Sequence, residues 1–459
     1  MIKFLNVYYP TRTVILPIFE AILIGSCFLL ATLIALGPGD AFIALNYEQG
    51  WLQIGGVTLV TLILSYYFDL YEPQLVSSRL DVYFRVLLVL AFDCFIVSGL
   101  MYFFPELGIS RNVPVLGFGL LTLALIAWRR AYDWIVWLPA FRERVYILGA
   151  GDHARLMVQT LRSRPDIGME VCYWEDIELD QAERRKYWID NLKRIADERP
   201  IINRVIIAMD TQRGELPVQE LLDLRFRGVT IEEACTLRER LSGKIPLDGL
   251  RPSQFLYAEG FRIKPSQQLS RQIVSTLAAG VGLLLFLPFF PFVLIAIKLS
   301  SQGPIFFKQT RVGVGGRHFH VYKFRSMRTD AEAAGAKYAT KDDPRVYRFG
   351  GIMRKTRIDE IPQLWNVLKG DMGFVGPRPE RPEFIPWLAE QLPFYNLRLL
   401  IRPGLTGWAQ VRYGYGATLA ESREKLEYDL YYVKHMSLGL DLLIMFETIK
   451  IILRRRGAQ

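Results

Sequence analysis

Two adjacent carboxylates lie within a run of cations in the last third of the chain. Asp359 and Glu360 follow Arg354 and Arg357, and they precede an amphipathic stretch with Pro362 in its first turn. This position suits a helix N-cap, and capping alone accounts for Asp359. The alternative is chemical, because a carboxylate pair beside cations at the positive end of a helix stays ionised at neutral pH and can attack phosphorus. Both interpretations stay open on these residues alone.

An alternating run of basic and apolar residues precedes this pair. If the run is a strand, Lys323 and Arg325 share one face, and Tyr322 and Phe324 share the other. A cationic face suits phosphate, but it also suits plain solvation. His318 and His320 nearby have the spacing of metal ligands, and because no further His or thiol is close in sequence, no metal is assigned to them.

Two rigid turns carry further arginines. Arg378 stands between two prolines in the segment 376–382, which restricts the backbone around a guanidinium suited to phosphate. We interpret Arg378 as a candidate diphosphate clamp. Arg402 opens the segment 402–410, a turn with a hydroxyl, an indole and an amide, and a purely structural turn is the alternative.

Composition places this chemistry at a membrane. The chain has 459 residues, enough for about three domains, with 51% hydrophobic and 22% charged residues and a mean hydropathy of +0.18. These values exclude a disordered chain and favour a membrane protein. The net charge of +10 suits anionic partners such as lipid or phosphate. The four cysteines are far apart and form no CxxC pair, which indicates a reducing compartment.

Four apolar runs predict a four-helix anchor at the N-terminus. Their ranges are 14–36, 51–70, 86–104 and about 107–128. Glu20 and Asp93 lie inside these runs, and either function or packing against neighbouring helices explains such acids. The first loop has no Lys or Arg, whereas basic residues precede the first run and follow the fourth, so both ends of the anchor face the cytoplasm.

The segment after the anchor has an α/β pattern. Residues 144–154 read as a buried strand, a turn with Gly149 and Gly151, and a helix start. Such glycines let a phosphate approach the helix N-terminus, or they only make a tight turn. Later strands and helices extend the pattern to about residue 250 and predict a Rossmann-like domain. A nucleotide-sugar dehydratase or epimerase would share this layout, but no Tyr has a Lys four positions later.

A second apolar stretch, 273–297, precedes the acidic pair and is broken by Pro288 and Pro291. Basic residues flank both of its ends, so a straight span would place one cluster outside, against the positive-inside bias. A helix that enters and leaves by the same face avoids this, and an ordinary kinked span is the alternative. The C-terminal run 438–453 is short for a span and predicts an interfacial helix.

Five motifs in fixed order resemble a known family. They occupy 308–313, 322–327, 359–372, 375–380 and 402–411. Over about 267–456 the chain resembles the bacterial polyprenyl-phosphate phosphoglycosyl transferases, and the anchor and middle segment resemble the long members that initiate exopolysaccharide or O-antigen synthesis. Two departures are Arg357, where many members have a small residue, and the segment 411–415, where many have Val-Asn-Gly.

The resemblance implies a fold class of membrane α plus α/β. It comprises a four-helix transmembrane anchor (1–141), a Rossmann-like, CoA-binding-like cytoplasmic domain (142–250), a linker (251–266) and a monotopic α+β catalytic domain (267–459) with a re-entrant helix at 273–297. Pro288 matches the helix break of the family.

The resemblance also implies the roles of the site residues. Asp359 is the nucleophile and a Mg2+ ligand, Glu360 is its partner, and the substrate-binding cations are Lys323, Arg325, Arg354, Arg378 and Arg402. The cofactor is Mg2+ at the diphosphate. Gly149 and Gly151 form a candidate nucleotide turn whose ligand the resemblance does not give.

These observations predict an enzyme of the bacterial inner membrane, multi-pass, with its catalytic domain on the cytoplasmic face. It moves a sugar 1-phosphate from a UDP-sugar to undecaprenyl phosphate and releases UMP. The expected partners are this donor, this acceptor, membrane lipids, a second copy of the chain and downstream glycosyltransferases; no nucleic acid is expected. The alternatives are an anchored NAD-dependent oxidoreductase and a non-catalytic membrane scaffold.

Overall fold

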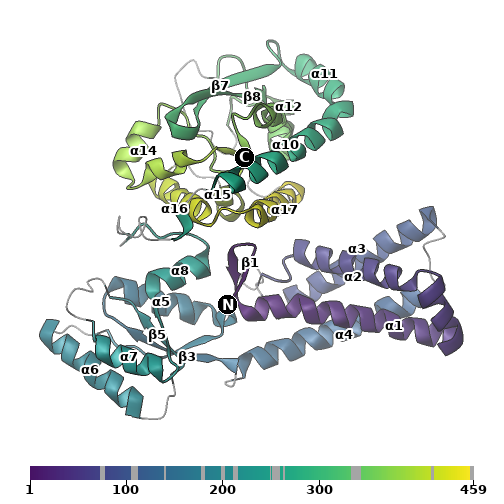
Figure 1. Cartoon of the computed structure of the whole chain (residues 1–459). Helices are drawn as coiled ribbons and strands as arrows, with labels where there is room; N and C mark the ends of the chain where they lie inside the picture. Colours follow the sequence, from purple (N-terminus) through teal and green to yellow (C-terminus); the bar gives the residue numbers. More distant parts are fainter. Residues whose placement is uncertain are drawn as a thin grey trace. The chain divides into compact units, whose positions relative to one another are not determined.

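A computed structural model describes the chain in two compact units (Figure 1). It describes all residues except 73–77, 105–111, 139–140, 177–180, 198–201, 210–215, 249, 251–258, 262–263, 332–342, 415–417 and 455–459. The first unit contains Met1–Ile2 and Tyr9–Ala234, and the second contains Lys3–Tyr8 and Cys235–Gln459. The boundary predicted at 250 therefore lies inside the second unit. Most of the predicted linker, the start of the fourth apolar run at 107–111 and the terminal arginines 455–456 lie outside the described residues.

The four N-terminal apolar runs form four long helices. They are α1 (Thr11–Tyr47), α2 (Gly50–Tyr67), α3 (Arg79–Phe103) and α4 (Asn112–Trp137). Together with the stretch Pro265–Ser300, they are the five helices of the described chain that are long and apolar enough to cross a membrane. Helix α1 extends past the predicted run, with a kink where Gly37 has φ +78° and Pro38 follows.

Charged residues inside this bundle have partners within it. Glu20 lies 2.7 Å from the guanidinium of Arg129, and the hydroxyl of Tyr71 donates to Glu20 at 2.7 Å. Asp93 accepts a hydrogen bond from Thr61 on α2. Pairing of this kind lowers the cost of burying charge between helices. The two acids therefore face neighbouring helices of the bundle.

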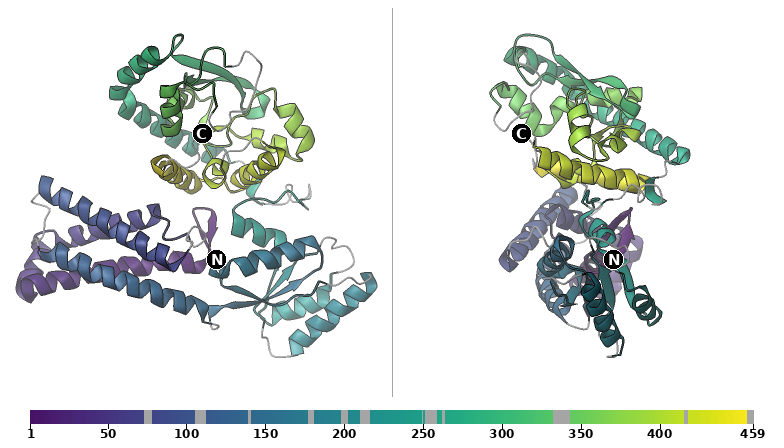
Figure 2. Two further views of the ribbon diagram at one scale, coloured as in Figure 1. Left: turned by 180° about the vertical axis from the view of Figure 1, so that it is seen from behind. Right: turned by 90° about the vertical axis from the view of Figure 1, so that its left-hand side faces the viewer.

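A four-stranded parallel sheet follows α4, which we call the middle sheet. Its strands are β3 (Glu143–Leu148), β4 (Met169–Tyr173), β5 (Arg204–Ile207) and β6 (Thr230–Glu233), in the order β4-β3-β5-β6. The connecting helices are α5 (Asp152–Ser163), α6 (Gln181–Asp197) and α7 (Val218–Phe226). Side chains of α6 and α7 pack with Tyr146 and Leu148 on one face, and α5 lies on the other (Figures 1 and 2). Parallel strands covered on both faces explain the continuous apolar runs.

The second unit begins with α8 (Ala234–Ser242) and the proline-broken apolar stretch. That stretch consists of α10 (Pro265–Phe286), a 3-10 turn at Leu287–Phe289 and α11 (Phe290–Ser300). Pro288 lies in the 3-10 turn, and the chain changes direction there (Figure 1). Both halves contact the same unit, because α10 packs against α13 and β9 while α11 packs against α12.

The remaining elements build the surface beside this stretch. An antiparallel hairpin is formed by β7 (Phe306–Val312) and β8 (His318–Phe324). Then come α12 (Arg348–Thr356), a 3-10 turn (Ile358–Glu360), α13 (Gln363–Lys369), β9 (Gly373–Val375), α14 (Ile385–Gln391), a 3-10 helix (Tyr395–Leu400), β10 (Gly404–Thr406), α15 (Trp408–Arg412), α16 (Leu419–His435) and α17 (Leu438–Arg454). Strands β9 and β10 pair in parallel.

Candidate active site

The acidic pair lies in the short turn between α12 and α13. Helix α12 ends at Thr356, its C-cap residue Arg357 has φ +59°, and the 3-10 turn Ile358–Glu360 follows at once. The left-handed conformation explains why a small residue suits this position, since a Cβ disfavours it. Asp359 and Glu360 are both buried, with 6% and 8% of their surface exposed. Helix α13 has Pro362 as its N-cap and no side-chain cap, so the N-cap interpretation of Asp359 is wrong.

Glu360 is held by cations from three separate elements. Its Oε1 atom lies 2.7 Å from Arg378, 3.2 Å from Lys323 and 3.9 Å from Arg357. Burial disfavours the charge of Glu360, but these cations outweigh burial and hold the pKa of Glu360 well below its ordinary value. Glu360 is therefore a fixed anion that gathers the cations around the pair.

Asp359 is in the opposite electrostatic state. Burial, followed by the charge of Glu360, raises the pKa of Asp359 to about 6, against the pull of Lys323, Arg357 and Arg354. Its Oδ1 atom is buried and has no hydrogen-bond partner among the described residues. A carboxylate that is ionised at neutral pH and lacks a partner keeps its lone pairs for a ligand or an electrophile.

The strand that carries Lys323 is fixed to the helix that follows the acidic pair. Asn366 on α13 is fully buried, and its amide donates to the carbonyl of His320 at 2.7 Å. Its Oδ1 atom accepts from the backbone of Tyr322 at 3.1 Å. Burial lowers the pKa of Lys323. Asn366 therefore sets the distance between the ammonium group and the acidic pair, a role that the motif did not reveal.

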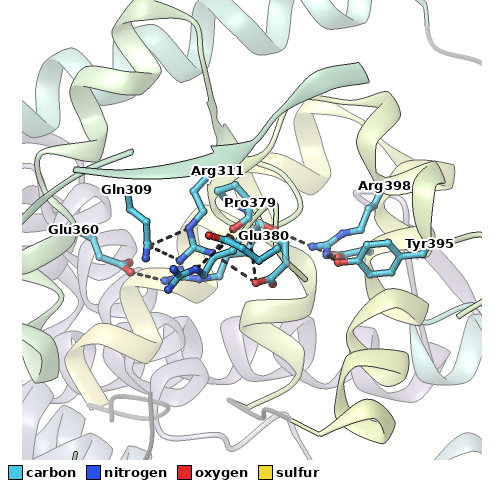
Figure 3. A network of polar contacts seen from close by, with 11 residues as sticks. Gln309, Arg311, Glu360, Pro379, Glu380, Tyr395 and Arg398 are labelled. Carbon is cyan, nitrogen blue, oxygen red and sulfur yellow. Dashed lines mark hydrogen bonds and ion pairs between the residues drawn. The ribbon is translucent and has the colours of Figure 1, made fainter. Parts of the chain in front are cut away.

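The loop that carries Arg378 is held at three successive carbonyl groups (Figure 3). Arg398 donates to the carbonyl of Arg378 at 2.9 Å, and Arg311 donates to that of Pro379 at 3.1 Å. The backbone of Val312 donates to the carbonyl of Glu380 at 3.0 Å. Anchoring the backbone on both sides of Arg378 orients its guanidinium before any ligand arrives.

The two glycine-proline motifs lie side by side through their backbones. The amide of Gly404 donates to the carbonyl of Pro377 at 2.9 Å, and that of Gly376 donates to Thr406 at 2.9 Å. A Cβ on Gly404 would lie 2.0 Å from the amide nitrogen of Gly376. The absence of a Cβ in these glycines therefore allows the two backbones to come this close. The segment that begins at Arg402 lies against the Arg378 loop as a result.

A buried ion pair behind the site was not apparent from the sequence. Arg398 lies 2.8 Å from Asp429 on α16, and it donates to the hydroxyl of Tyr395 at 2.7 Å. Burial raises the pKa of Asp429 to about 6, although Arg398 opposes this. Helical periodicity places Asp429 on the apolar side of α16. A carboxylate at a buried position needs a cationic partner, and this is the sequence signal that could have pointed to Arg398.

The structure separates the predicted cations into two groups. Lys323 and Arg378 contact Glu360 directly, and Arg354 acts on Asp359 through its charge. Arg325 is elsewhere, because its guanidinium is buried and donates to the carbonyls of Ser301 and Gln302 after α11. Alternate residues point to the same face only within a strand. Strand β8 ends at Phe324, so Arg325 lies beyond it and does not share the direction of Lys323.

Arg402 is exposed, and it has no ion pair with a carboxylate in the part of the chain that the structure describes. The structure therefore does not bring it to the acidic pair.

Gly149 in the turn of the middle sheet has a packing role. Gly149 has φ +148°, and a Cβ there would lie 2.2 Å from the carbonyl oxygen of Ala208. Gly151 has φ +92° and is the N-cap of α5. These glycines belong to the first unit, whereas the acidic pair belongs to the second.

The protein groups at the acidic pair suit a metal ion only if a bound substrate supplies further oxygen ligands. No group of three or more His, Cys, Asp or Glu that could hold a metal occurs in the described parts of the chain. Mg2+ is typically bound by one or two carboxylates together with substrate phosphates. The unpartnered oxygen of Asp359 fits such a site.

Comparisons with known proteins give the family that the chain matches. Residues 266–455 match the family model described as Bacterial sugar transferase. A UDP-N-acetylgalactosamine-undecaprenyl-phosphate N-acetylgalactosaminephosphotransferase of Aeromonas hydrophila is 44% identical over 223 residues, 49% of this chain and 52% of the relative. A UDP-glucose:undecaprenyl-phosphate glucose-1-phosphate transferase of Escherichia coli is 32% identical over 310 residues, 65% of this chain and 66% of the relative.

A third relative is covered almost completely. The protein of Caulobacter vibrioides with the same name as the Escherichia coli relative is 38% identical over 236 residues, 49% of this chain and 88% of the relative. The chain thus spans about half to two thirds of the length of the first two relatives, and most of the third.

Proposed function

Because the chain belongs to the bacterial sugar transferase family, we propose that it transfers a sugar 1-phosphate from a UDP-sugar to undecaprenyl phosphate and so initiates the synthesis of an exopolysaccharide or O-antigen. The observation that carries this proposal is the unpartnered, buried oxygen of Asp359 beside a glutamate that holds three cations. The relatives act on glucose or N-acetylgalactosamine by their names, so the sugar is left open.

In the first step Asp359 acts as the nucleophile. One of its carboxylate oxygens attacks the phosphorus that carries the sugar, and the bond from that phosphorus to the bridging oxygen breaks. UMP leaves with the bridging oxygen and its electron pair, and the sugar phosphate remains on the carboxylate. Arg378 and Lys323 stabilise the charge that develops on the phosphoryl oxygens, because donors fixed in a buried site need no reorganisation.

In the second step a phosphate oxygen of the lipid acceptor attacks the same phosphorus. The bond to Asp359 breaks, the carboxylate is restored, and the lipid leaves with a diphosphate-linked sugar. Two half-reactions at one site let a soluble donor and a membrane-embedded acceptor bind in turn, which predicts ping-pong kinetics.

Mg2+ bound by Asp359 and the diphosphate would neutralise phosphate charge and so help UMP to leave. The oxygen of Asp359 is the protein ligand that this arrangement requires. Glu360 is committed to its cations, so we assign it to orienting Arg378 and Lys323 rather than to the metal.

The broken stretch α10–α11 supports a re-entrant arrangement in the membrane. Pro288 interrupts the helix in the 3-10 turn, and both halves return to the same compact unit. Apolar residues of both halves, such as Leu285 and Phe292, are exposed, as lipid contact requires. Entry and exit by one face would keep the acidic pair on the cytoplasmic side, at the depth of the acceptor phosphate.

The test is release of UMP by the purified full chain from a panel of UDP-sugars with undecaprenyl phosphate and Mg2+. Asp359→Asn should abolish release, because an amide cannot form the phosphoryl bond. A donor labelled in the sugar-bearing phosphate should label the wild-type polypeptide when the acceptor is omitted, and should leave Asp359→Asn unlabelled.

Asp330→Asn is the matched control, because Asp330 is an exposed carboxylate of the same unit. It should retain wild-type turnover and labelling. Turnover by Asp359→Asn, or turnover without any label on the wild-type chain, would contradict the proposed nucleophile. No release from any UDP-sugar would contradict the proposed activity.

A further inference from the structure

The turn with Gly149 and Gly151 after β3 faces a carboxylate of the chain itself, that of Asp176. The backbone amide of Gly151 lies 3.5 Å from Oδ1 of Asp176, and Arg155 on α5 donates to the same carboxylate at 2.5 Å. Asp152 adds a second negative charge in the first turn of α5. Arg155 also lies 3.6 Å from Asp152, so the amide and the cation at this helix start are both engaged by carboxylates of the chain.

A cavity next to this turn lies on the face of the sheet that α6 covers, and Gly149 is part of its lining. Its volume is about 130 Å3, and it is lined by the ends of β3 and β4 and by one side of α6. Tyr146 and Trp188 are almost completely buried, whereas Tyr173 is 39% exposed; Trp174 and Tyr187 complete the aromatic lining. Ligands of parallel α/β sheets bind at the carboxyl ends of strands, which is where this cavity lies.

The polar residues of the cavity are of two kinds. Some are held by hydrogen bonds to one another, and one is the exposed cation Arg194. Asn191 bonds with the hydroxyls of Tyr146 and Tyr187, and the hydroxyl of Tyr187 donates to Glu175. Arg194, one turn further along α6, lines the same cavity and is exposed. Within the described residues, no carboxylate forms an ion pair with Arg194. It is therefore available to an anion at the mouth.

The size and lining of the cavity define what fits. A cavity of about 150 Å3 is large enough for benzene, so the interior of this one matches a single planar ring, and any further group of a ligand would lie at its open mouth. Aromatic walls favour a planar ring, because a base stacks favourably on an aromatic side chain. Asn191 and Glu175 offer hydrogen-bond partners for the edge of a heterocycle, and Arg194 offers a bidentate donor for phosphate.

We propose that this cavity binds a pyrimidine nucleotide, with the ring between the aromatic residues of β4 and α6 and the phosphate at Arg194. The proposal does not depend on the transfer reaction, because every residue of the cavity belongs to the first unit and the acidic pair belongs to the second.

The experiment is hydrogen–deuterium exchange of the purified full chain, titrated with UMP, CMP or AMP. Exchange is read by peptide, so binding at the middle sheet is distinguished from binding near Asp359. We expect UMP and CMP to protect peptides that cover 171–176 and 184–197, and AMP to protect them at least tenfold less well at equal concentration. Failure of the transfer assay would leave this expectation unchanged.

Arg194→Ala tests the phosphate contact. The midpoint of protection should rise about tenfold, which corresponds to about 1.4 kcal/mol. Lys193→Ala is the matched control, since Lys193 is the neighbouring exposed cation on α6 and does not line the cavity; its midpoint should equal that of the wild type. Because Arg194 is exposed, the variant should unfold at the wild-type temperature.

Three results would overturn the proposal. The first is the absence of protection in these peptides at millimolar UMP and CMP. The second is equal or better protection by AMP, which would exclude a single-ring site. The third is the same midpoint for Arg194→Ala and Lys193→Ala, which would show that the phosphate does not lie at Arg194.

Discussion

Asp359 and Glu360 are neighbours in sequence but have opposite electrostatic surroundings. Glu360 has three cationic partners, so its pKa lies well below the ordinary value. Asp359 has a buried oxygen with no hydrogen-bond partner among the described residues, and its pKa is raised to about 6. Two adjacent carboxylates with separated pKa values are the pattern expected where one group orients cations and the other reacts.

The first prediction concerns the stability cost of Asp359. Its pKa is about 6 in the folded chain and about 3.9 in an unfolded one, so the ionised carboxylate opposes folding above pH 6. Asp359→Asn removes this cost and should raise the free energy of unfolding on the order of 3 kcal/mol at pH 7.5. The gain should shrink as the pH falls through 6 and vanish below the unfolded pKa of about 3.9, where both states bind the proton. Denaturation of the solubilised protein across this pH range measures it.

The same series with Asp330→Asn provides the control, since this exposed carboxylate should show no gain at any pH. A destabilised Asp359→Asn at pH 7.5, or a gain that grows toward acid, would contradict the raised pKa.

At the scale of elements, the site depends on loops fixed by partners distant in sequence. The Arg378 loop is held by Arg398 from the 3-10 helix and by Arg311 from β7 (Figure 3). Arg398 in turn is paired with Asp429 on α16. The guanidinium of Arg378, which contacts Glu360, is therefore positioned through Arg398 and, through it, by Asp429 in the buried part of α16.

The second prediction tests Arg398 as a positioning residue. Arg398→Met leaves Asp429 buried without its partner, which typically costs about 3–5 kcal/mol, and it frees the carbonyl of Arg378. The double variant Arg398→Met/Asp429→Leu removes the unpaired charge and should recover most of this stability. Its kcat should nevertheless stay at least tenfold below wild type, because the carbonyl of Arg378 itself loses its donor while only the neighbouring carbonyls of the loop remain held. Thermal unfolding and UMP release measure the two effects.

Tyr395→Phe is the control for this pair of effects. It removes one partner of Arg398 but keeps the bond to the Arg378 loop, so kcat should change less than threefold. Full recovery of kcat in the double variant would show that Arg398 acts only on stability.

At the scale of the whole molecule, the first residues of the chain belong to the second unit. Asn6 donates to the carbonyl of His435 at the end of α16 at 3.0 Å, and the hydroxyl of Tyr431 donates to the carbonyl of Asn6 at 3.2 Å. Tyr8 packs edge-on against the ring of His435. Because α16 also carries Asp429, the N-terminal segment supports the helix behind the site.

The third prediction concerns this segment. Asn6 has φ +64°, so Asn6→Ala loses both the hydrogen bond and a residue that tolerates the left-handed turn, at a cost of about 2 kcal/mol in total. Asn6→Gly keeps the turn and should cost about half as much. Faster hydrogen exchange of the α16 peptides should accompany both changes.

Asn396→Ala is the control, because Asn396 is an exposed asparagine of the same unit; it should leave the exchange of α16 unchanged. Equal exchange in Asn6→Ala and wild type would show that the segment does not support α16.

The sequence by itself determined the parts of this protein that depend on local spacing. Apolar runs long enough to span a membrane predicted α1 to α4, and alternation predicted β8, because these patterns follow directly from helix and strand geometry. The ordered motifs identified Asp359, Glu360, Lys323 and Arg378 as site candidates, and the structure brings these four together.

The tertiary structure decided which cations meet the acidic pair. Arg325 and Lys323 are two residues apart, yet Arg325 binds the carbonyls after α11 while Lys323 binds Glu360. Arg398 and Asp429 position the site without belonging to any of the five motifs, and Asn366 belongs to the third motif, which did not reveal its partners on β8. Spacing along one element fixes only the direction of a side chain, whereas its partner is set by which distant elements pack beside it, and that packing is a property of the folded chain.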